Sequence, residues 1–160
     1  APNDYTVSKR MLSSFVSSYK HDFTHWHFYI PTIYGAGENP KRLIPYVINA
    51  IRNGEELHFT AGDQTRQYVH VSEVPRMLAQ AFDKSLPSGL YNIQGKETVT
   101  VKEIVTEIHH AMGKEVPDGC FGSVQRADVG MKYLALDGKK LHDATGFEAS
   151  IKITDVIDTY

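Results

Sequence analysis

An apolar and aromatic run over residues 26–30 constrains the fold of this chain more than any other stretch. It reads Trp-His-Phe-Tyr-Ile and ends at Pro31. A dense run of this kind is typical of a strand buried within a sheet. A helix is predicted just before it, over residues 4–19, because apolar side chains recur there at helical spacing: Tyr5, Leu12, Val16 and Tyr19. The chain is therefore predicted to begin with a helix followed by a buried strand.

The segment after this strand, residues 31–40, is rich in residues that form turns. Ligands of open α/β sheets bind in loops that follow the carboxyl ends of strands, so this loop is a candidate binding segment. A plain connection between two elements is the alternative. Pro40 lies at or near the start of the next helix, which is predicted to run to Asn53 and to stop at Gly54.

The rest of the chain is predicted to contain short strands and helices. Thr100 is expected to cap a helix that runs to Met112, with Glu103 completing a capping box and Gly113 ending the helix. Ser72 is expected to cap an earlier helix. The other predicted elements are strands over 57–61, 67–71, 90–93 and 133–136, and helices over 74–82, 138–144 and 152–160.

The composition limits the classes of protein to which the chain can belong. With 160 residues, 41% of them hydrophobic, the chain can bury a core, and its length favours one domain. The net charge of -2 argues against a nucleic-acid partner, which needs a basic surface. Cys120 is the single cysteine, which suits a reducing compartment, and no apolar run is long enough to span a membrane. We expect a cytoplasmic globular protein.

Tyr5 and Lys9 form the first candidate for chemistry. In a helix, residues at this spacing lie one above the other on the same face. An ammonium near a phenol favours the phenolate, and a phenol tuned in this way can exchange a proton with a substrate hydroxyl. From the spacing alone, the alternative is a surface tyrosine beside a surface lysine, without a catalytic role.

Two isolated arginines and one asparagine are candidate ligand-binding residues. Arg66 lies where a loop meets a predicted strand, and Arg126 lies in a loop. A guanidinium can clamp a phosphate or carboxylate, although a solvated surface arginine is the alternative at each position. Asn92 is polar among apolar neighbours, so it is either hydrogen-bonded within the fold or directed at a ligand. No metal site is expected, since His25 and His27 have no third ligand nearby.

The order of these motifs resembles the C-terminal half of the extended short-chain dehydrogenase/reductases, the NAD-dependent nucleotide-sugar epimerase/dehydratase family. The similarity runs from Tyr5 nearly to Tyr160. The matching pieces, in chain order, are Tyr5-x-x-x-Lys9, Ile33-Tyr34-Gly35-Ala36-Gly37, Pro40-Lys41-Arg42-Leu43-Ile44-Pro45, the segment 62–71, Tyr91-Asn92-Ile93, Arg126 and Asp137-x-x-Lys140-Leu141 before Gly146-Phe147.

The resemblance implies a Rossmann-type doubly wound sheet, of which residues 1–35 would supply the last helix and strand. Residues 36–160 would form a smaller mixed α/β substrate-binding lobe. The resemblance also implies an NAD cofactor, with NADP as the alternative. Tyr5 would be the catalytic acid/base, and Lys9 would assist it and hold the nicotinamide ribose. Three further residues would border the nicotinamide: Ile30, Pro31 and Ile33.

The same resemblance implies that the substrate is a nucleoside-diphosphate sugar. Arg66 and Arg126 would grip its diphosphate from two sides. The other expected substrate contacts come from Thr32, Arg42, Leu43 and Asn92. The complete enzyme is expected to be a homodimer, with no nucleic-acid or membrane partner.

The chain also departs from the family pattern. It contains no glycine-rich dinucleotide turn that opens a helix, so the cofactor domain and the family's catalytic Ser or Thr are expected upstream. Many members have Arg and Asn where this chain has Tyr29 and Thr32. The predicted function is the C-terminal half of an epimerase or dehydratase. The alternatives are a 4-keto reductase, a nucleoside-diphosphate-binding module and an inactive fragment without redox chemistry.

Overall fold

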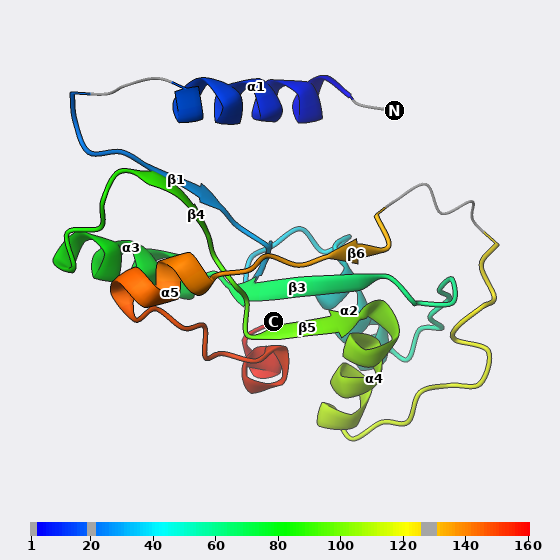
Figure 1. The fold of residues 1–160 in the computed structure, drawn as a ribbon. Coiled ribbons are helices and arrows are strands. Elements are labelled where there is room, and N and C mark those ends of the chain that lie inside the picture. The colour runs from blue at the N-terminus through cyan, green and yellow to red at the C-terminus, as the bar shows by residue number, and fades with distance from the viewer. Residues whose placement is uncertain (1–2, 19–21, 126–130) are drawn as a thin grey trace.

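The computed structural model describes residues 3–18, 22–125 and 131–160. The architecture is mixed α/β, as predicted (Figure 1). None of the helices in the described ranges has the length and apolarity that a membrane crossing requires. The element order is α1 (Asp4–Ser18), β1 (Trp26–Tyr29), β2 (Thr32–Tyr34), α2 (Leu43–Asn53), β3 (Thr65–His70), α3 (Glu73–Asp83), β4 (Gly89–Asn92), β5 (Glu97–Thr100), α4 (Val101–Ala111), β6 (Tyr133–Leu134), α5 (Lys139–Thr145) and the 3-10 helix η1 (Ile153–Thr159).

The strands form two small sheets. The first pairs β1 with β4 in parallel, so that Trp26 lies opposite Gly89 and Tyr29 opposite Asn92. The second has the strand order β2-β3-β5, in which β2 is parallel and β5 antiparallel to β3. The short strand β6 pairs in parallel with the start of β3. β3 is therefore the strand on which the second sheet is built (Figure 1).

Helix α1 lies apart from the rest of the fold (Figure 1). None of its side chains is buried, and its apolar residues Met11 and Leu12 are exposed. A contact of 3.1 Å between Ser13 Oγ and His27 Nε2 joins the helix to β1. The predicted apolar stripe of this helix therefore lies mostly open to solvent.

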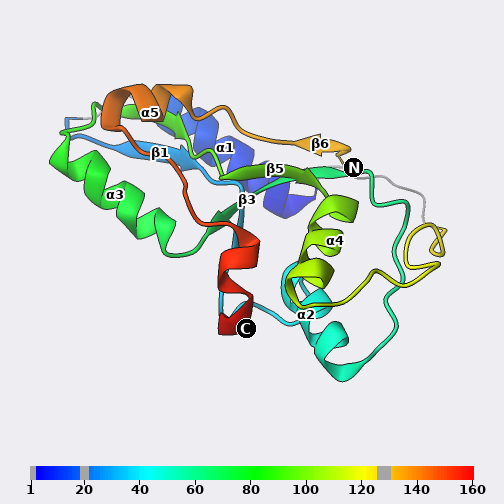
Figure 2. The ribbon, with the colours of Figure 1, turned by 90° about the horizontal axis from the view of Figure 1, so that it is seen from below.

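Two hydrophobic cores hold the helices and strands together. The first joins α2 and α4 to the second sheet and to η1, with Tyr34, Ile48 and Ile104 among its buried residues. The second packs α3 and α5 against β1 and β4, with Met77 and Leu141 among its buried residues. Figure 2 shows α2 and α4 together at one end of the molecule and α3 and α5 at the other.

Three segments differ from the strand predictions. Residues 57–61 do not form the predicted strand, and Phe59 makes an isolated bridge with Phe121 instead. Residues 32–34, predicted as loop, form β2, and residues 97–100, for which no strand was predicted, form β5. Both strands pair with β3, and such long-range pairing outweighs local sequence preference in short strands.

The helix ends largely follow the predicted signals. Thr100 Oγ1 accepts a hydrogen bond of 3.1 Å from the Glu103 N–H, and Glu103 Oε2 accepts one of 2.7 Å from the Thr100 N–H. The predicted capping box is therefore confirmed. Helix α2 begins at Leu43 rather than at Pro40, and it ends as predicted at Gly54, whose φ of 68° is left-handed.

The prediction that Ser72 caps a helix is right in position, but the expected hydrogen bond is absent. Ser72 occupies the N-cap position of α3, but it makes no side-chain cap hydrogen bond. Its hydroxyl lies 2.8 Å from Nδ1 of His70 instead. The backbone of Ser72 is already helical (φ -71°, ψ -17°), whereas a capping residue usually has extended dihedrals that aim its side chain at the first turn.

The expected domain boundary at residue 35 separates strands that the structure pairs. β4 lies beyond that boundary and pairs with β1, which lies before it. β2 lies before the boundary and pairs with β3, which lies beyond it. The division into residues 1–35 and 36–160 stays a prediction, while the packing groups the elements into the two cores described above.

Candidate active site

Tyr5 and Lys9 lie together on one exposed face of α1. The Lys9 ammonium is 5.6 Å from the centre of the Tyr5 ring. Tyr5 is 70% exposed, so its ring is open to a ligand. Among the described residues, Lys9 forms no ion pair with a carboxylate. The two side chains are therefore neighbours on the helix, and their catalytic role stays a prediction.

The segment after β1 begins where β1 and β4 both end. Ile30 and Ile33 are 40% and 36% exposed, whereas Pro31 is buried. Thr32 is partly buried and lies opposite Tyr68 in the β2–β3 pair. The two isoleucines thus offer an apolar edge at the carboxyl end of a parallel strand, where α/β sheets usually bind their ligands.

Arg42 immediately precedes α2 and is held from two sides. Its Nε lies 3.1 Å from Oε2 of Glu38, and its Nη2 donates a hydrogen bond of 3.3 Å to the carbonyl of Ile33. The Arg42 side chain is 50% exposed, so it is open to solvent as well as anchored. Its neighbour Leu43 packs against the first core and is partly buried.

Arg66 lies on β3, and its charge acts on the same tyrosine as that of Arg42. Its Nη1 donates a hydrogen bond of 2.8 Å to the carbonyl of Thr65. Tyr68 is two positions further along the strand, and hence on the same face. Burial raises the pKa of Tyr68 to about 12, while the positive charges of Arg66 and Arg42 act in the opposite direction. Two of the predicted substrate-binding residues, Arg42 and Arg66, thus both act electrostatically on Tyr68 in the second sheet.

Asn92 ends β4 and is hydrogen-bonded within the fold. Its side-chain amide donates a bond of 3.0 Å to the carbonyl of Asp137. The sequence left open whether this side chain bonds internally or points to a ligand, and the internal bond is present. Its place beside a nucleotide stays a prediction. Arg126, the second predicted diphosphate clamp, lies outside the described residues.

The pair on α1 and the two arginines belong to separate parts of the fold. No hydrogen bond or ion pair between described residues links Tyr5 or Lys9 to Arg42 or Arg66. Figure 1 shows α1 running above β1 and apart from β3. A ligand that contacted both groups would have to reach from α1 to the second sheet.

Two residues that the sequence did not single out belong to the region around Arg42. Glu38 contacts Arg42, and the Tyr160 hydroxyl donates a hydrogen bond of 2.7 Å to Glu38 Oε1. Burial raises the pKa of Tyr160, and the bond to Glu38 raises it further. The four-residue spacing of Glu38 and Arg42 was a signal available in the sequence. Nothing local points to Tyr160, which is 122 residues from Glu38.

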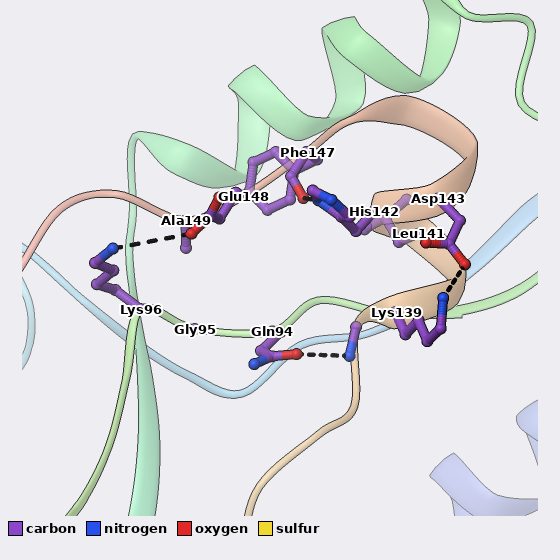
Figure 3. A pocket seen from close by; sticks show the side chains of 11 residues that line it. Gln94, Gly95, Lys96, Lys139, Leu141, His142, Asp143, Phe147, Glu148 and Ala149 are labelled. Atoms are coloured by element: carbon purple, nitrogen blue, oxygen red, sulfur yellow. Dashed lines mark hydrogen bonds and ion pairs between the residues drawn. The ribbon is translucent and has the colours of Figure 1, made fainter.

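A cavity of about 390 Å³ lies elsewhere, between α5 and the loop from β4 to β5 (Figure 3). Charged side chains around it are paired with one another. Lys139 Nζ lies 2.6 Å from Asp143 Oδ2, and Lys96 Nζ lies 3.9 Å from Glu148 Oε1. Its lining includes none of the residues predicted for the site. We therefore place the candidate active site at α1 and the second sheet.

The described part of the chain offers neither a metal site nor a reactive thiol. It contains no group of three or more His, Cys, Asp or Glu side chains placed to hold a metal ion. Cys120 is 2% exposed, and burial raises the pKa of its thiol. A buried thiol with a raised pKa carries little of the reactive thiolate.

Comparison with known proteins identifies similar sequences. The model of the NAD dependent epimerase/dehydratase family matches residues 1–93. The chain is similar to the dTDP-glucose 4,6-dehydratase of Streptomyces griseus, with 26% identity over 127 residues, 76% of this chain and 37% of that protein. It is also similar to the CDP-abequose synthase of Salmonella muenchen, with 26% identity over 87 residues, 51% of this chain and 30% of that protein. The chain thus spans about a third of the length of these curated relatives.

Solved structures share the fold at low sequence identity. The NAD complex of Bordetella bronchiseptica WbmG matches with a TM-score of 0.79 and 18% identity, over 99% of this chain and 49% of that chain. The NAD complex of the dTDP-glucose 4,6-dehydratase of Bacillus anthracis matches with a TM-score of 0.80 and 19% identity, over 100% of this chain and 53% of that chain. The predicted Rossmann-type α/β fold class is confirmed by these likenesses.

Proposed function

This chain belongs to the NAD-dependent epimerase/dehydratase family, and from that membership we propose that it is the C-terminal part of an enzyme that alters the sugar of a nucleoside-diphosphate sugar with NAD as cofactor. The family match covers residues 1–93, more than half of the 160 residues. Because the chain spans about half the length of the solved structures similar to it, the proposal concerns the complete protein.

The pairing of Tyr5 with Lys9 carries the proposal. As a phenolate, Tyr5 would accept the proton of a sugar hydroxyl while the neighbouring C–H bond breaks. The Lys9 ammonium, 5.6 Å from the centre of the ring, would stabilise the negative charge of that phenolate. The ring is 70% exposed on α1, so a ligand can approach it.

The residues present fit a nicotinamide cofactor. Lys9 has an ammonium that can donate hydrogen bonds to ribose hydroxyls. Ile30 and Ile33 have exposed apolar side chains that would border the nicotinamide ring, beside the buried Pro31. NAD, when bound, supplies the acceptor for the hydride that leaves the sugar. The tasks of this chain are to hold the ribose, border the ring and move the hydroxyl proton.

Arg66 and Arg126 would bind the diphosphate of the substrate, because a guanidinium matches the geometry of phosphate oxygens. Arg42 would line the nucleotide pocket, and its half-exposed guanidinium would add a positive charge for the phosphates there. The remaining proposed contacts come from Thr32, Leu43 and Asn92. Among the solved structures of similar fold, WbmG is in complex with NAD and UDP, and a Bacillus cereus UDP-glucuronic acid 4-epimerase with NAD and UDP-glucuronic acid.

Epimerisation, 4,6-dehydration and 4-keto reduction share this hydride step or its reverse, so the product identifies the reaction. The complete protein would be incubated with NAD or NADH and with UDP-, dTDP- and CDP-linked sugars, and the products examined by NMR and mass spectrometry. We expect a converted sugar on an intact nucleotide. A protein that binds nucleoside diphosphates but converts none of these sugars would contradict the proposal and favour a binding module. A homodimeric complete enzyme is part of the same proposal.

A further inference from the structure

A series of contacts joins Tyr160 to Arg42. The Tyr160 hydroxyl donates a hydrogen bond of 2.7 Å to Glu38 Oε1, and Glu38 Oε2 lies 3.1 Å from Arg42 Nε. Arg42 Nη2 in turn donates to the carbonyl of Ile33 at 3.3 Å. The Glu38 side chain is only 13% exposed, whereas that of Arg42 is 50% exposed. A mostly buried carboxylate therefore shares its two oxygens between a tyrosine and a half-exposed arginine.

The Glu38–Arg42 pair does not lie on a regular helix. The two residues are four positions apart, but α2 begins only at Leu43. Turns bring them together, since the Arg42 N–H donates to the Asn39 carbonyl at 2.9 Å and the Glu38 N–H to the Gly35 carbonyl at 3.3 Å. Burying a carboxylate is costly unless its charge is paired. The loop conformation and the ion pair therefore support each other.

We infer that Glu38 is a positioning residue of the nucleotide site, holding the Arg42 guanidinium in place for the phosphates of a nucleoside diphosphate. This inference rests on the proposed function. A free arginine side chain loses much rotational freedom when it binds a ligand, and that loss weakens binding. The contacts at Nε and Nη2 fix the guanidinium beforehand. Tyr160 fixes Glu38 in turn.

Positioning and charge predict opposite effects of Glu38. A carboxylate beside Arg42 lowers the local positive potential, so its removal would strengthen anion binding if charge alone mattered. If Glu38 positions Arg42, its removal weakens anion binding. The sign of the change in affinity therefore separates the two roles.

The test measures the affinity of the complete protein for UDP and dTDP by titration calorimetry. We expect Glu38→Ala to weaken binding about 5- to 20-fold and Tyr160→Phe about 2- to 5-fold. Both effects are smaller than the loss of a direct hydrogen bond to a charged group, because each residue acts on the ligand only through Arg42. Neither change should weaken binding further once Arg42→Ala is present. Glu38→Gln should retain most of the affinity, because its amide oxygen can still accept a hydrogen bond from Arg42.

Glu115→Ala is the matched control for charge, because it removes a carboxylate that is 96% exposed. It should leave the affinity unchanged. Tighter or unchanged binding by Glu38→Ala, or an equal loss in the Arg42→Ala background, would overturn the inference and leave the proposed function intact. If Glu38→Ala does not fold, the same comparison is made with Tyr160→Phe. If the unmodified protein binds neither nucleotide, the proposed function fails, and the inference fails with it.

Discussion

The carboxylate of Glu73 accepts a hydrogen bond of 2.6 Å from the backbone N–H of Ser150, which lies 77 residues further along the chain. The same Oε1 accepts a hydrogen bond of 2.9 Å from Arg76 Nη2 and one of 3.2 Å from Ser150 Oγ. Arg76 also donates to the carbonyl of Glu148 at 2.7 Å and lies over the ring of Phe147, 4.7 Å from its centre. Glu73 and Arg76 thus fasten the segment after α5 to the start of α3.

Replacing Glu73 should destabilise the fold. Its side chain is 1% exposed, and its loss would leave the Ser150 N–H without this acceptor and Arg76 without its carboxylate. We expect Glu73→Ala to lower the free energy of unfolding by about 2–4 kcal/mol, since it removes several hydrogen bonds of one buried carboxylate at once. Urea denaturation measures this change. Glu115→Ala removes an exposed carboxylate and should change the free energy of unfolding by less than about 0.5 kcal/mol. An equal effect of the two substitutions would show that Glu73 does not fasten the segment after α5 to α3.

Replacing Tyr5 by phenylalanine should remove activity and leave the fold intact. The side chain is 70% exposed, so loss of its hydroxyl has little effect on packing. We expect turnover of the nucleotide sugar by the complete enzyme to fall about 100- to 10,000-fold, the usual contribution of a general acid or base, with nucleotide affinity nearly unchanged. Ser18→Ala removes an exposed hydroxyl from the same helix and should have no effect on turnover. An equal loss of turnover and affinity in Tyr5→Phe would make Tyr5 a structural residue.

Replacing Arg66 should weaken substrate binding. We expect Arg66→Ala to reduce the affinity for a nucleoside-diphosphate sugar by roughly 1.5–3 kcal/mol, the scale of a hydrogen bond to a charged group. The loss should be smaller at high salt, because ions screen exposed charges. Calorimetric titration at two ionic strengths measures both. Lys84→Ala removes an equal charge from an exposed position at the end of α3 and serves as the control. Unchanged affinity in Arg66→Ala would return Arg66 to an ordinary surface residue.

Stability should fall at alkaline pH through Tyr68. Burial raises the pKa of this phenol from 10.0 to about 12 in the folded state, so the folded protein holds the proton more tightly than the unfolded chain. The contribution of Tyr68 to the free energy of unfolding is therefore fully present below pH 10. It is lost as the pH rises from about 10 to about 12.

Ionisation of Tyr68 should lower the free energy of unfolding by on the order of 2–3 kcal/mol, since one pKa unit corresponds to about 1.4 kcal/mol. Denaturation between pH 9 and 12 should show a shallower decline for Tyr68→Phe than for the unmodified protein. Tyr34 and Tyr160, whose pKa values burial also raises, contribute to the slope in the same direction. Identical slopes for the two proteins would contradict the role of Tyr68.

The candidate site was predictable where it depends on local geometry. Tyr5 and Lys9 meet because the helical period places them on one face, and the spacing of the two residues shows this directly. The cap of Thr100 by Glu103 has the same local origin. By contrast, the tie between Glu38 and Tyr160 spans 122 residues and depends on how η1 packs against the first core. No sequence pattern near Glu38 or near Tyr160 predicts this hydrogen bond.

The sequence by itself determined the α/β class, the position of α1 and β1, several helix ends and the Tyr5–Lys9 pair, because each depends on neighbours within a turn or on a dense apolar run. Only the tertiary structure decided that residues 32–34 and 97–100 become strands, that β1 pairs with β4, and that the charges of Arg42 and Arg66 both act on Tyr68. These features join distant segments. Their stability comes from pairing between distant strands and from burial in two cores, which exist only once the whole chain has packed.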